Sequence, residues 1–270
     1  MRETEMRNPK TTHIDRMSTI EMIDLLNEEN LNAVRAVADA RDEIARAVDA
    51  LTEVLDHGKR IFYVGAGTSG RLGVVDASEC PPTFGVSPET VTGIIAGGRN
   101  AMFEAGEKEE DSAETGGSDL CAAGASRGDA VVGISAAGSA PYVIGALEKA
   151  KELGCVTVSL TSNPGAPITR IADIAIVTRT GAEAVTGSTR MKAGTAQKLV
   201  LNALSTCAMI KTGKVYENLM INLKPSNAKL RARMIGIVKE LTGLDEKESE
   251  RLLEAHQWDI RRAVCLVRTL

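Results

Sequence analysis

The sequence has few aromatic residues and no long hydrophobic run. Of its 270 residues only three are Phe, three are Tyr and one is Trp, which is a poor supply for the stacking platforms that bind single-stranded nucleic acids. The formal net charge of -4 also argues against the basic face that a nucleic-acid binder needs. No segment approaches the roughly 18 apolar residues that span a bilayer. We therefore expect neither a nucleic-acid partner nor membrane association.

Histidine and cysteine are also too sparse or too scattered to suggest a site. The three histidines lie far apart in the sequence, and the five cysteines include no CxxC pair. An odd, dispersed set of thiols is typical of reduced core cysteines rather than of disulfides or zinc ligands. The N-terminal segment lacks the apolar core of a signal peptide. These features predict a cytoplasmic protein without a metal centre or a Ser–His triad.

Residues 1–58 show helical periodicity in two stretches. In STIEMIDLLNEEN, Ser18 precedes Glu21 at the spacing of a capping box. From Leu31 onward apolar residues recur at helical spacing as far as Gly58, a residue type that often ends helices. We expect one helix after Ser18 and a second from about Leu31 to Gly58, both packing on the core.

After Gly58 the sequence changes to short apolar runs that alternate with helical segments. Five runs are rich in β-branched residues and apolar on both faces, as buried parallel strands are. These runs are RIFYVGAG, VTGIIAGG, DAVVGISAAG, CVTVSLTSN and ADIAIVTRT. The alternation predicts an α/β fold with a doubly wound, mainly parallel five-stranded sheet in residues 59–224. Residues 225–270 are charged and helical, and they predict a small C-terminal helical subdomain.

The segment GAGTSG follows the first predicted strand and opens a helix. It satisfies the GxGxxG fingerprint of dinucleotide sites, but such sites usually end the second strand with a carboxylate, and here that strand ends in AGGR. Glycines let the backbone approach an anion closely, and a helix N-terminus attracts it. We favour a phosphosugar loop formed by Gly67, Thr68 and Ser69 over a nicotinamide site or a purely structural turn.

The helix that starts at this loop is expected to be short. Pro81 and Pro82 interrupt it, and Pro81 should push Cys80 out of helical geometry. Glu79 then lies near the helix C-terminus, where negative charge is disfavoured and the protonated carboxyl is favoured. Glu79 is therefore a candidate proton donor, with an ordinary surface glutamate as the alternative.

Several long motifs resemble the N-acetylmuramic acid 6-phosphate etherases of the sugar isomerase (SIS) superfamily. They include GAGTSGRLGVVDASECPPTFG, VTGSTRMKAGTAQKLVLNALST and GKVYENLM, and the resemblance runs from HIDRMST into the C-terminal tail. It implies cleavage of the D-lactyl ether of N-acetylmuramate 6-phosphate in cell-wall amino sugar recycling, by elimination and then hydration, giving N-acetylglucosamine 6-phosphate and D-lactate. It also implies a homodimer with a shared active site, and no metal or redox cofactor.

The family reaction needs two carboxylates with different roles. One removes the acidic proton beside the aldehyde carbon, and the other protonates the departing lactate oxygen and helps to add water. The resemblance assigns the proton donor to Glu79 through DASECPP. Counting from IAGG assigns the base to Glu110, although AGEKEEDS departs from the family's EGAEDS form. Spacing alone does not separate Glu110 from its acidic neighbours, which are Glu107, Glu109 and Asp111.

The block GSTRMKAGTAQK is expected to begin a long helix that ends at about Gly213. Its hydroxyls, backbone donors and cations suit a phosphate or the lactyl carboxylate. Ordinary helix capping and surface charge explain any one of these residues equally well. The candidate binding residues of this block are Ser188, Thr189, Arg190 and Lys192, together with Lys198 and, less strongly, the preceding Glu183.

The turn after the third strand departs from the family pattern. The family form resembles SASGRTP and binds the sugar phosphate through hydroxyls, whereas this chain has SAAGSAP at residues 135–141. Ser135 and Gly138 match, and Ser139 replaces the arginine, so we expect these three residues to bind substrate. Alanines at 137 and 140 replace a serine and a threonine, and each lost charged hydrogen bond is worth about 1.5–3 kcal/mol. A non-catalytic phosphosugar regulator, similar to the glucokinase-regulator branch, and a phosphosugar isomerase therefore stay open as alternatives.

Overall fold

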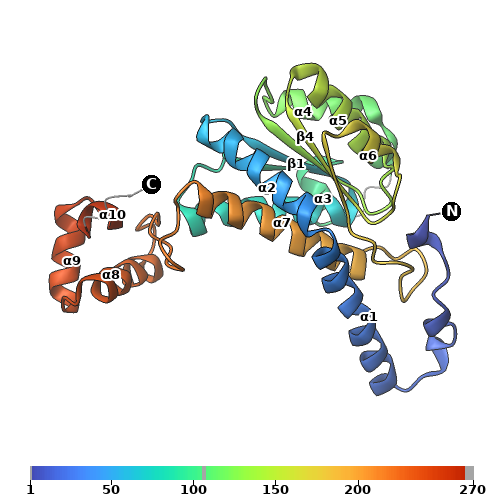
Figure 1. Ribbon diagram of the computed structural model, residues 1–270, viewed down its shortest axis with the longest axis horizontal. Helices are drawn as coiled ribbons and strands as arrows, with labels where there is room; N and C mark the ends of the chain where they lie inside the picture. The colour runs from blue at the N-terminus through green and yellow to red at the C-terminus, as the bar shows by residue number, and fades with distance from the viewer. Residues whose placement is uncertain (1, 105–107, 265–270) are drawn as a thin grey trace. The chain divides into compact units, whose positions relative to one another are not determined.

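Figure 1 shows the computed structural model, which describes residues 2–104 and 108–264. The chain forms two compact units. The first comprises Met1–Ser78 with Glu89–Ala208, and the second comprises Glu79–Pro88 with Met209–Leu270. The division at 1–58, 59–224 and 225–270 that the sequence suggested stays a prediction.

The first unit is built on a five-stranded sheet in the order β2-β1-β3-β4-β5. Its strands are β1 (Ile61–Gly65), β2 (Val91–Ile95), β3 (Ala130–Ile134), β4 (Val156–Thr161) and β5 (Ile174–Val177). All neighbouring pairs are parallel. The order reverses direction at β1 and β3, as it does in doubly wound α/β proteins. The predicted fold class and all five predicted strands are confirmed.

Helices cover both faces of this sheet (Figure 1). One face carries α4 (Ala113–Ala122), α5 (Pro141–Leu153) and α6 (Pro167–Ile171), and the other carries α2 (Arg41–Asp56), α3 (Gly67–Phe84) and α7 (Lys192–Lys211). Phe62, Val131 and Leu147 belong to a fully buried cluster on the first face. On the second face, a Cβ at Gly73 of α3 would lie 3.1 Å from that of Tyr63. Burial of such side chains stabilises the layers by about 1.5–3 kcal/mol each.

The N-terminal helix α1 (Thr19–Asp39) begins at the predicted capping box. The Glu21 carboxylate accepts the backbone N–H of Ser18 at 2.7 Å, and the Ser18 hydroxyl accepts the N–H of Glu21. The predicted boundary at Leu31 is wrong, because α1 continues to Asp39 and α2 follows after Ala40. Ala40 is neither a glycine nor a proline but is 4% exposed, so packing sets this boundary instead of a breaker residue.

The predicted end of α3 before its prolines is also wrong. The helix continues through Pro81 and Pro82 to Phe84. The last turn is held within the second unit, because the Asn222 side-chain amide donates to the Phe84 carbonyl at 2.5 Å and Gly85, with φ of 63°, follows the helix in the left-handed region. Glu79 therefore lies more than one turn before the helix end, and the argument from the helix C-terminus does not apply to it.

The second unit contains α8 (Ala228–Thr242), α9 (Glu246–Ala255) and α10 (Ile260–Ala263). Met234, Val238 and Leu253 are fully buried in its apolar cluster. Asn227 caps α8 and Asp245 caps α9. This arrangement confirms the predicted C-terminal helical appendage. Within the described ranges, no helix is long and apolar enough to cross a membrane.

Candidate active site

The carboxyl ends of β1, β2, β3 and β4 lie at one edge of the sheet. Gly65 is opposite both Ile95 and Ile134, and Ile134 is opposite Leu160. The predicted phosphosugar loops therefore begin side by side, as ligand loops do in doubly wound folds. The first loop is tight, since a Cβ on Gly70 would lie 2.6 Å from the Gly65 carbonyl oxygen.

Helix α3 begins at Gly67, so Thr68 and Ser69 lie in its first turn. The N–H groups of a first helical turn have no acceptor within the helix, and they favour an anion. Helix α7 packs against this turn, because the Ser69 hydroxyl donates to the Gln197 side-chain oxygen at 3.0 Å. The prediction that Gly67, Thr68 and Ser69 bind phosphate stays a prediction.

The third loop is bound mainly by the chain itself. The Ser135 hydroxyl accepts the Gly138 N–H at 3.0 Å. The Ala136 carbonyl accepts from the Asn163 side-chain amide at 2.9 Å and from the Thr161 hydroxyl at 3.1 Å. Gly138 has a φ of 70°, and a Cβ there would lie 2.4 Å from that of Ala166, so this position requires glycine. Ser135, Gly138 and the half-buried Ser139 stay predicted substrate contacts.

An N-terminal arm packs beside these loops, which the sequence did not predict. It consists of the 3-10 helices η1 (Glu3–Glu5), η2 (Pro9–Thr11) and η3 (Ile14–Arg16). The Asn163 amide donates to the Thr4 hydroxyl at 2.9 Å as well as to Ala136. Asn163 ends the predicted strand run CVTVSLTSN, but nothing local identifies Thr4 as its partner.

The first N–H groups of α7 are occupied by a buried carboxylate. Glu183 accepts the N–H of Ala193 at 2.9 Å and that of Lys192 at 3.2 Å. Burial raises the pKa of Glu183 above its ordinary value, although these two backbone hydrogen bonds lower it in part. Glu183, recognised only as a weak binding candidate, thus caps α7.

Lys192 is 3% exposed, and its ammonium forms an ion pair with Glu29. The Asn8 amide also donates to Glu29 at 2.8 Å. Burial alone would raise the pKa of Glu29, but the hydrogen bond and charge of Lys192, with smaller contributions from Asn8 and Lys10, leave that pKa below its ordinary value. Ser188 and Thr189 are half-buried, and Arg190 is exposed. Their binding roles, and that of Lys192, stay predictions.

The two predicted catalytic carboxylates lie on different elements. Glu79 is exposed on α3, and Glu110 is half-buried in η5 (Lys108–Asp111). Glu109 lies near the end of β2, because a Cβ on Gly97 would be 3.6 Å from its Cγ. Glu107 lies outside the described residues. The roles of Glu79 and Glu110 stay predictions.

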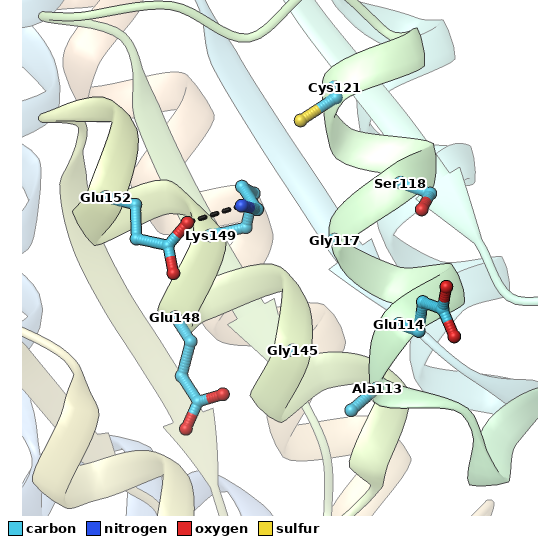
Figure 2. Close-up of a pocket in the computed structure, with 9 residues that line it drawn as sticks. All are labelled: Ala113, Glu114, Gly117, Ser118, Cys121, Gly145, Glu148, Lys149 and Glu152. Carbon is cyan, nitrogen blue, oxygen red and sulfur yellow. Dashed lines mark hydrogen bonds and ion pairs between the residues drawn. The ribbon is translucent and has the colours of Figure 1, made fainter.

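Two surface hollows differ in their suitability for a phosphosugar. One of about 610 Å³ lies between α4 and α5 (Figure 2). Its charged groups are three carboxylates, Glu114, Glu148 and Glu152, and one ammonium, Lys149, which pairs with Glu152. This excess of negative charge would repel a phosphate dianion. The other, of about 710 Å³, is mainly apolar and includes Gly97, Gly98 and Glu109 at the end of β2.

Among the residues the structure describes, no three His, Cys, Asp or Glu side chains gather as a metal site would require. None of the four described cysteines forms a disulfide with another described residue. The site therefore offers carboxylates, hydroxyls and backbone N–H groups for its chemistry, and the absence of a cofactor stays a prediction.

Comparison with protein families finds three matching models. The glucokinase regulatory protein N-terminal SIS domain matches residues 43–151, and the SIS domain matches residues 100–206. A UBA-like domain matches residues 238–267. These matches agree with the α/β core and with the helical C-terminal region.

Curated relatives match nearly the whole chain. The N-acetylmuramic acid 6-phosphate etherase of Cronobacter sakazakii (strain ATCC BAA-894) is 50% identical over 266 residues, covering 98% of this chain and 90% of its own. That of Symbiobacterium thermophilum (strain DSM 24528 / JCM 14929 / IAM 14863 / T) is 51% identical over 261 residues, covering 97% of this chain and 87% of its own.

Solved structures share the fold at low sequence identity. A phosphoheptose isomerase from Francisella tularensis is 17% identical with a TM-score of 0.54, covering 72% of this chain and 100% of its own. A phosphoheptose isomerase from Neisseria gonorrhoeae is 18% identical with a TM-score of 0.52, covering 71% of this chain and 99% of its own. At this identity they support the fold alone.

Proposed function

We infer the activity of this chain from its family, because the chain belongs to the N-acetylmuramic acid 6-phosphate etherases. It cleaves the D-lactyl ether of N-acetylmuramate 6-phosphate and releases D-lactate and N-acetylglucosamine 6-phosphate, a step of cell-wall amino sugar recycling. The observation that carries this conclusion is the 50% identity over 98% of the chain. Neither the regulator nor the isomerase alternative is favoured by these relatives.

We propose elimination followed by hydration as the route, with two glutamates as the base and the acid. In the open-chain aldehyde, the base removes the proton from the carbon beside the aldehyde carbon. The electron pair forms a carbon–carbon double bond, the ether bond breaks, and the acid protonates the departing lactate oxygen. Water then adds to the double bond. General acid–base catalysis of this kind contributes typically 10²–10⁴-fold to a rate.

We assign the proton-donor role to Glu79 and the base role to Glu110. Glu79 lies in the DASECPP motif and its side chain is exposed, so a substrate can reach it. Glu110 is half-buried in η5, in the acidic run that follows IAGG. The binding groups that we propose are Gly67, Thr68 and Ser69 of the first loop. Those of the later segments are Ser135, Gly138, Ser139, Ser188, Thr189, Arg190 and Lys192.

We propose that a second copy of the chain completes the site. At a rise of about 1.5 Å per residue, the interval from Gly67 to Glu79 spans roughly 18 Å along α3, which is longer than a hexose phosphate. Helix α1 also exposes apolar side chains at Ile20, Ile23 and Val34, by 63%, 48% and 56% respectively. Their helical spacing places them on one face, which suits contact with another copy. We also retain the predicted cytoplasmic location.

Release of D-lactate from purified protein and N-acetylmuramate 6-phosphate tests this function. We expect turnover by the natural sequence and a loss of at least about 100-fold for Glu79→Ala and for Glu110→Ala. Glu109→Ala and Asp111→Ala should retain activity and thereby separate Glu110 from its neighbours. Glu114→Ala, an exposed position on α4, is the matched surface control.

Product analysis separates the alternatives in the same assay. An isomerase would leave the lactyl ether intact, and a regulator would bind the phosphosugar without turnover. Either result with the natural sequence would contradict the proposed etherase activity. Unchanged lactate release in both glutamate variants would instead contradict only the assignment of roles.

A further inference from the structure

Gln197 is a buried polar residue of α7 that contacts the first phosphosugar loop. It is 1% exposed, and its side-chain oxygen accepts the hydroxyl of Ser69 at 3.0 Å. Its side-chain nitrogen Nε2 is buried and has no hydrogen-bond partner among the described residues. A second close approach lies one turn earlier, where a Cβ on Gly194 would be 3.5 Å from Cγ2 of Thr68. Helix α7 therefore approaches both residues of the loop, and Gln197 contacts the hydroxyl of Ser69.

The direction of this hydrogen bond decides what Ser69 can offer a ligand. A serine hydroxyl has one proton to donate, and a phosphate dianion has only acceptor oxygens. While Ser69 donates its proton to Gln197, it has none for a phosphate. The same arrangement leaves a buried N–H group unpaired, which is rarer in proteins than an under-satisfied carbonyl oxygen.

A half-turn of the Gln197 amide reverses the hydrogen bond without moving either backbone. Nε2 then donates to the Ser69 oxygen, and the side-chain oxygen of Gln197 becomes the buried atom that has no hydrogen-bond partner. Ser69 becomes free to donate its proton to a phosphate oxygen. No further group is required, because the two ends of a carboxamide have the same shape and opposite hydrogen-bonding character.

We propose that Gln197 is a positioning residue for Ser69: with a sugar phosphate bound, its amide donates to Ser69, and Ser69 donates to the phosphate. This inference rests on the proposed function, because it takes a sugar phosphate as the ligand of the first loop. It adds a residue of α7 to the phosphate site and gives the site two hydrogen-bonding states.

Two substitutions separate this role from simple support of the fold. In Gln197→Glu, measured at a pH high enough to ionise the buried carboxyl, the side chain only accepts and holds the Ser69 proton away from the ligand. In Gln197→Met the side chain neither donates nor accepts, so the Ser69 proton stays available. We expect the Kd for N-acetylglucosamine 6-phosphate, measured by calorimetry, to rise about tenfold or more in Gln197→Glu and only about two- to threefold in Gln197→Met.

Kinetics and a double variant complete the experiment. Gln197→Glu should raise KM for N-acetylmuramate 6-phosphate with little change in kcat, since it affects binding of a group remote from the reacting atoms. In a Ser69→Ala background the effect of Gln197→Glu should be clearly smaller, because the hydroxyl that it controls is gone and only the repulsion between the carboxylate and the phosphate remains. Thermal unfolding of each variant shows whether the fold is retained.

The outcomes for this inference and for the proposed function differ. Equal losses in Gln197→Glu and Gln197→Met, or an undiminished effect of Gln197→Glu in the Ser69→Ala background, would overturn the positioning role. Normal binding of N-acetylglucosamine 6-phosphate without lactate release would overturn the proposed function and leave the binding test of Gln197 decisive.

Discussion

The loop after β1 and the loop after β3 begin side by side but use their polar groups differently. In the first, Thr68 and Ser69 occupy the opening turn of a long helix, and only Ser69 is bound by another side chain of the described chain. In the loop after β3, the Ser135 hydroxyl and the Ala136 carbonyl are already bound by the chain's own groups. The difference lies in the direction of the hydrogen bonds: the Ser69 hydroxyl donates to Gln197, whereas the Ser135 hydroxyl accepts from Gly138 and keeps its own proton.

The largest expected effect tests whether Lys192, a predicted ligand residue of the segment that begins α7, is structural instead. Lys192→Met removes the buried cation beside Glu29 and leaves only the exposed Lys10 ammonium, 3.7 Å away, which should lower the free energy of unfolding by about 3 kcal/mol. Denaturant unfolding measures this change. The matched control is Arg190→Met. Because Arg190 is exposed, the free energy of unfolding of this variant should lie within about 0.5 kcal/mol of that of the natural sequence. A Lys192→Met variant that stays fully stable but loses substrate binding would make Lys192 a ligand residue instead.

The effect of pH gives an independent check on the same ion pair. The pKa of Glu29 in the folded chain lies below its ordinary value of 4.5. Its contribution to stability is therefore present above that value and is lost as the pH falls through the folded pKa. The gap in unfolding free energy between the natural sequence and Lys192→Met should narrow as the pH falls below 4.5. A gap that does not depend on pH would contradict this account.

A smaller effect is expected from Gly138→Ala, which breaks the geometry of the loop after β3. The new Cβ would lie 2.4 Å from that of Ala166, at a φ of 70°, so we expect a loss of about 1–3 kcal/mol in thermal unfolding. The control is Gly236→Ala in α8, where no atom lies within 4 Å of the new Cβ and helix propensity favours alanine. If both variants behave alike, position 138 in the loop after β3 does not require glycine.

The smallest effect sharpens the comparison by restoring a ligand group. Ala137 is half-buried at the position where the family motif has serine. Ala137→Ser should lower KM for N-acetylmuramate 6-phosphate by about tenfold, the lower end of the value of one hydrogen bond to a charged group. Ala137→Val adds bulk without a hydroxyl and should show no gain. An unchanged KM in Ala137→Ser would mean that the loop after β3 does not contact the phosphate.

The sequence was sufficient for the parts of the fold that local patterns determine. The five strands are predicted because each is a short β-branched run, and the capping box at Ser18 is predicted because its two residues are three apart. Local rules failed at Ala40 and at Pro81, where packing prevails over the propensities of single residues. A terminal helical turn tolerates proline when neighbouring groups hold it, as the Asn222 amide holds the Phe84 carbonyl.

The candidate site was less predictable than the fold. Motifs predicted the loops and the two glutamates as site residues, but the partners of the loop residues are distant in the sequence. Ser69 and Gln197 are 128 positions apart, and Thr4 and Asn163 are 159 apart. No periodicity connects such pairs. Lys192 also matched a ligand pattern, yet its role depends on Glu29, a buried residue of α1 that the helical pattern alone does not distinguish.

Exchange of hydrogen for deuterium in the substrate tests the assignment of the two glutamates most directly. In D2O, the base alone is needed to exchange the proton beside the aldehyde carbon, whereas departure of lactate also needs the acid. We predict that Glu79→Ala still exchanges this proton but releases almost no lactate, and that Glu110→Ala does neither. Loss of exchange in Glu79→Ala with exchange retained in Glu110→Ala would contradict the assignment.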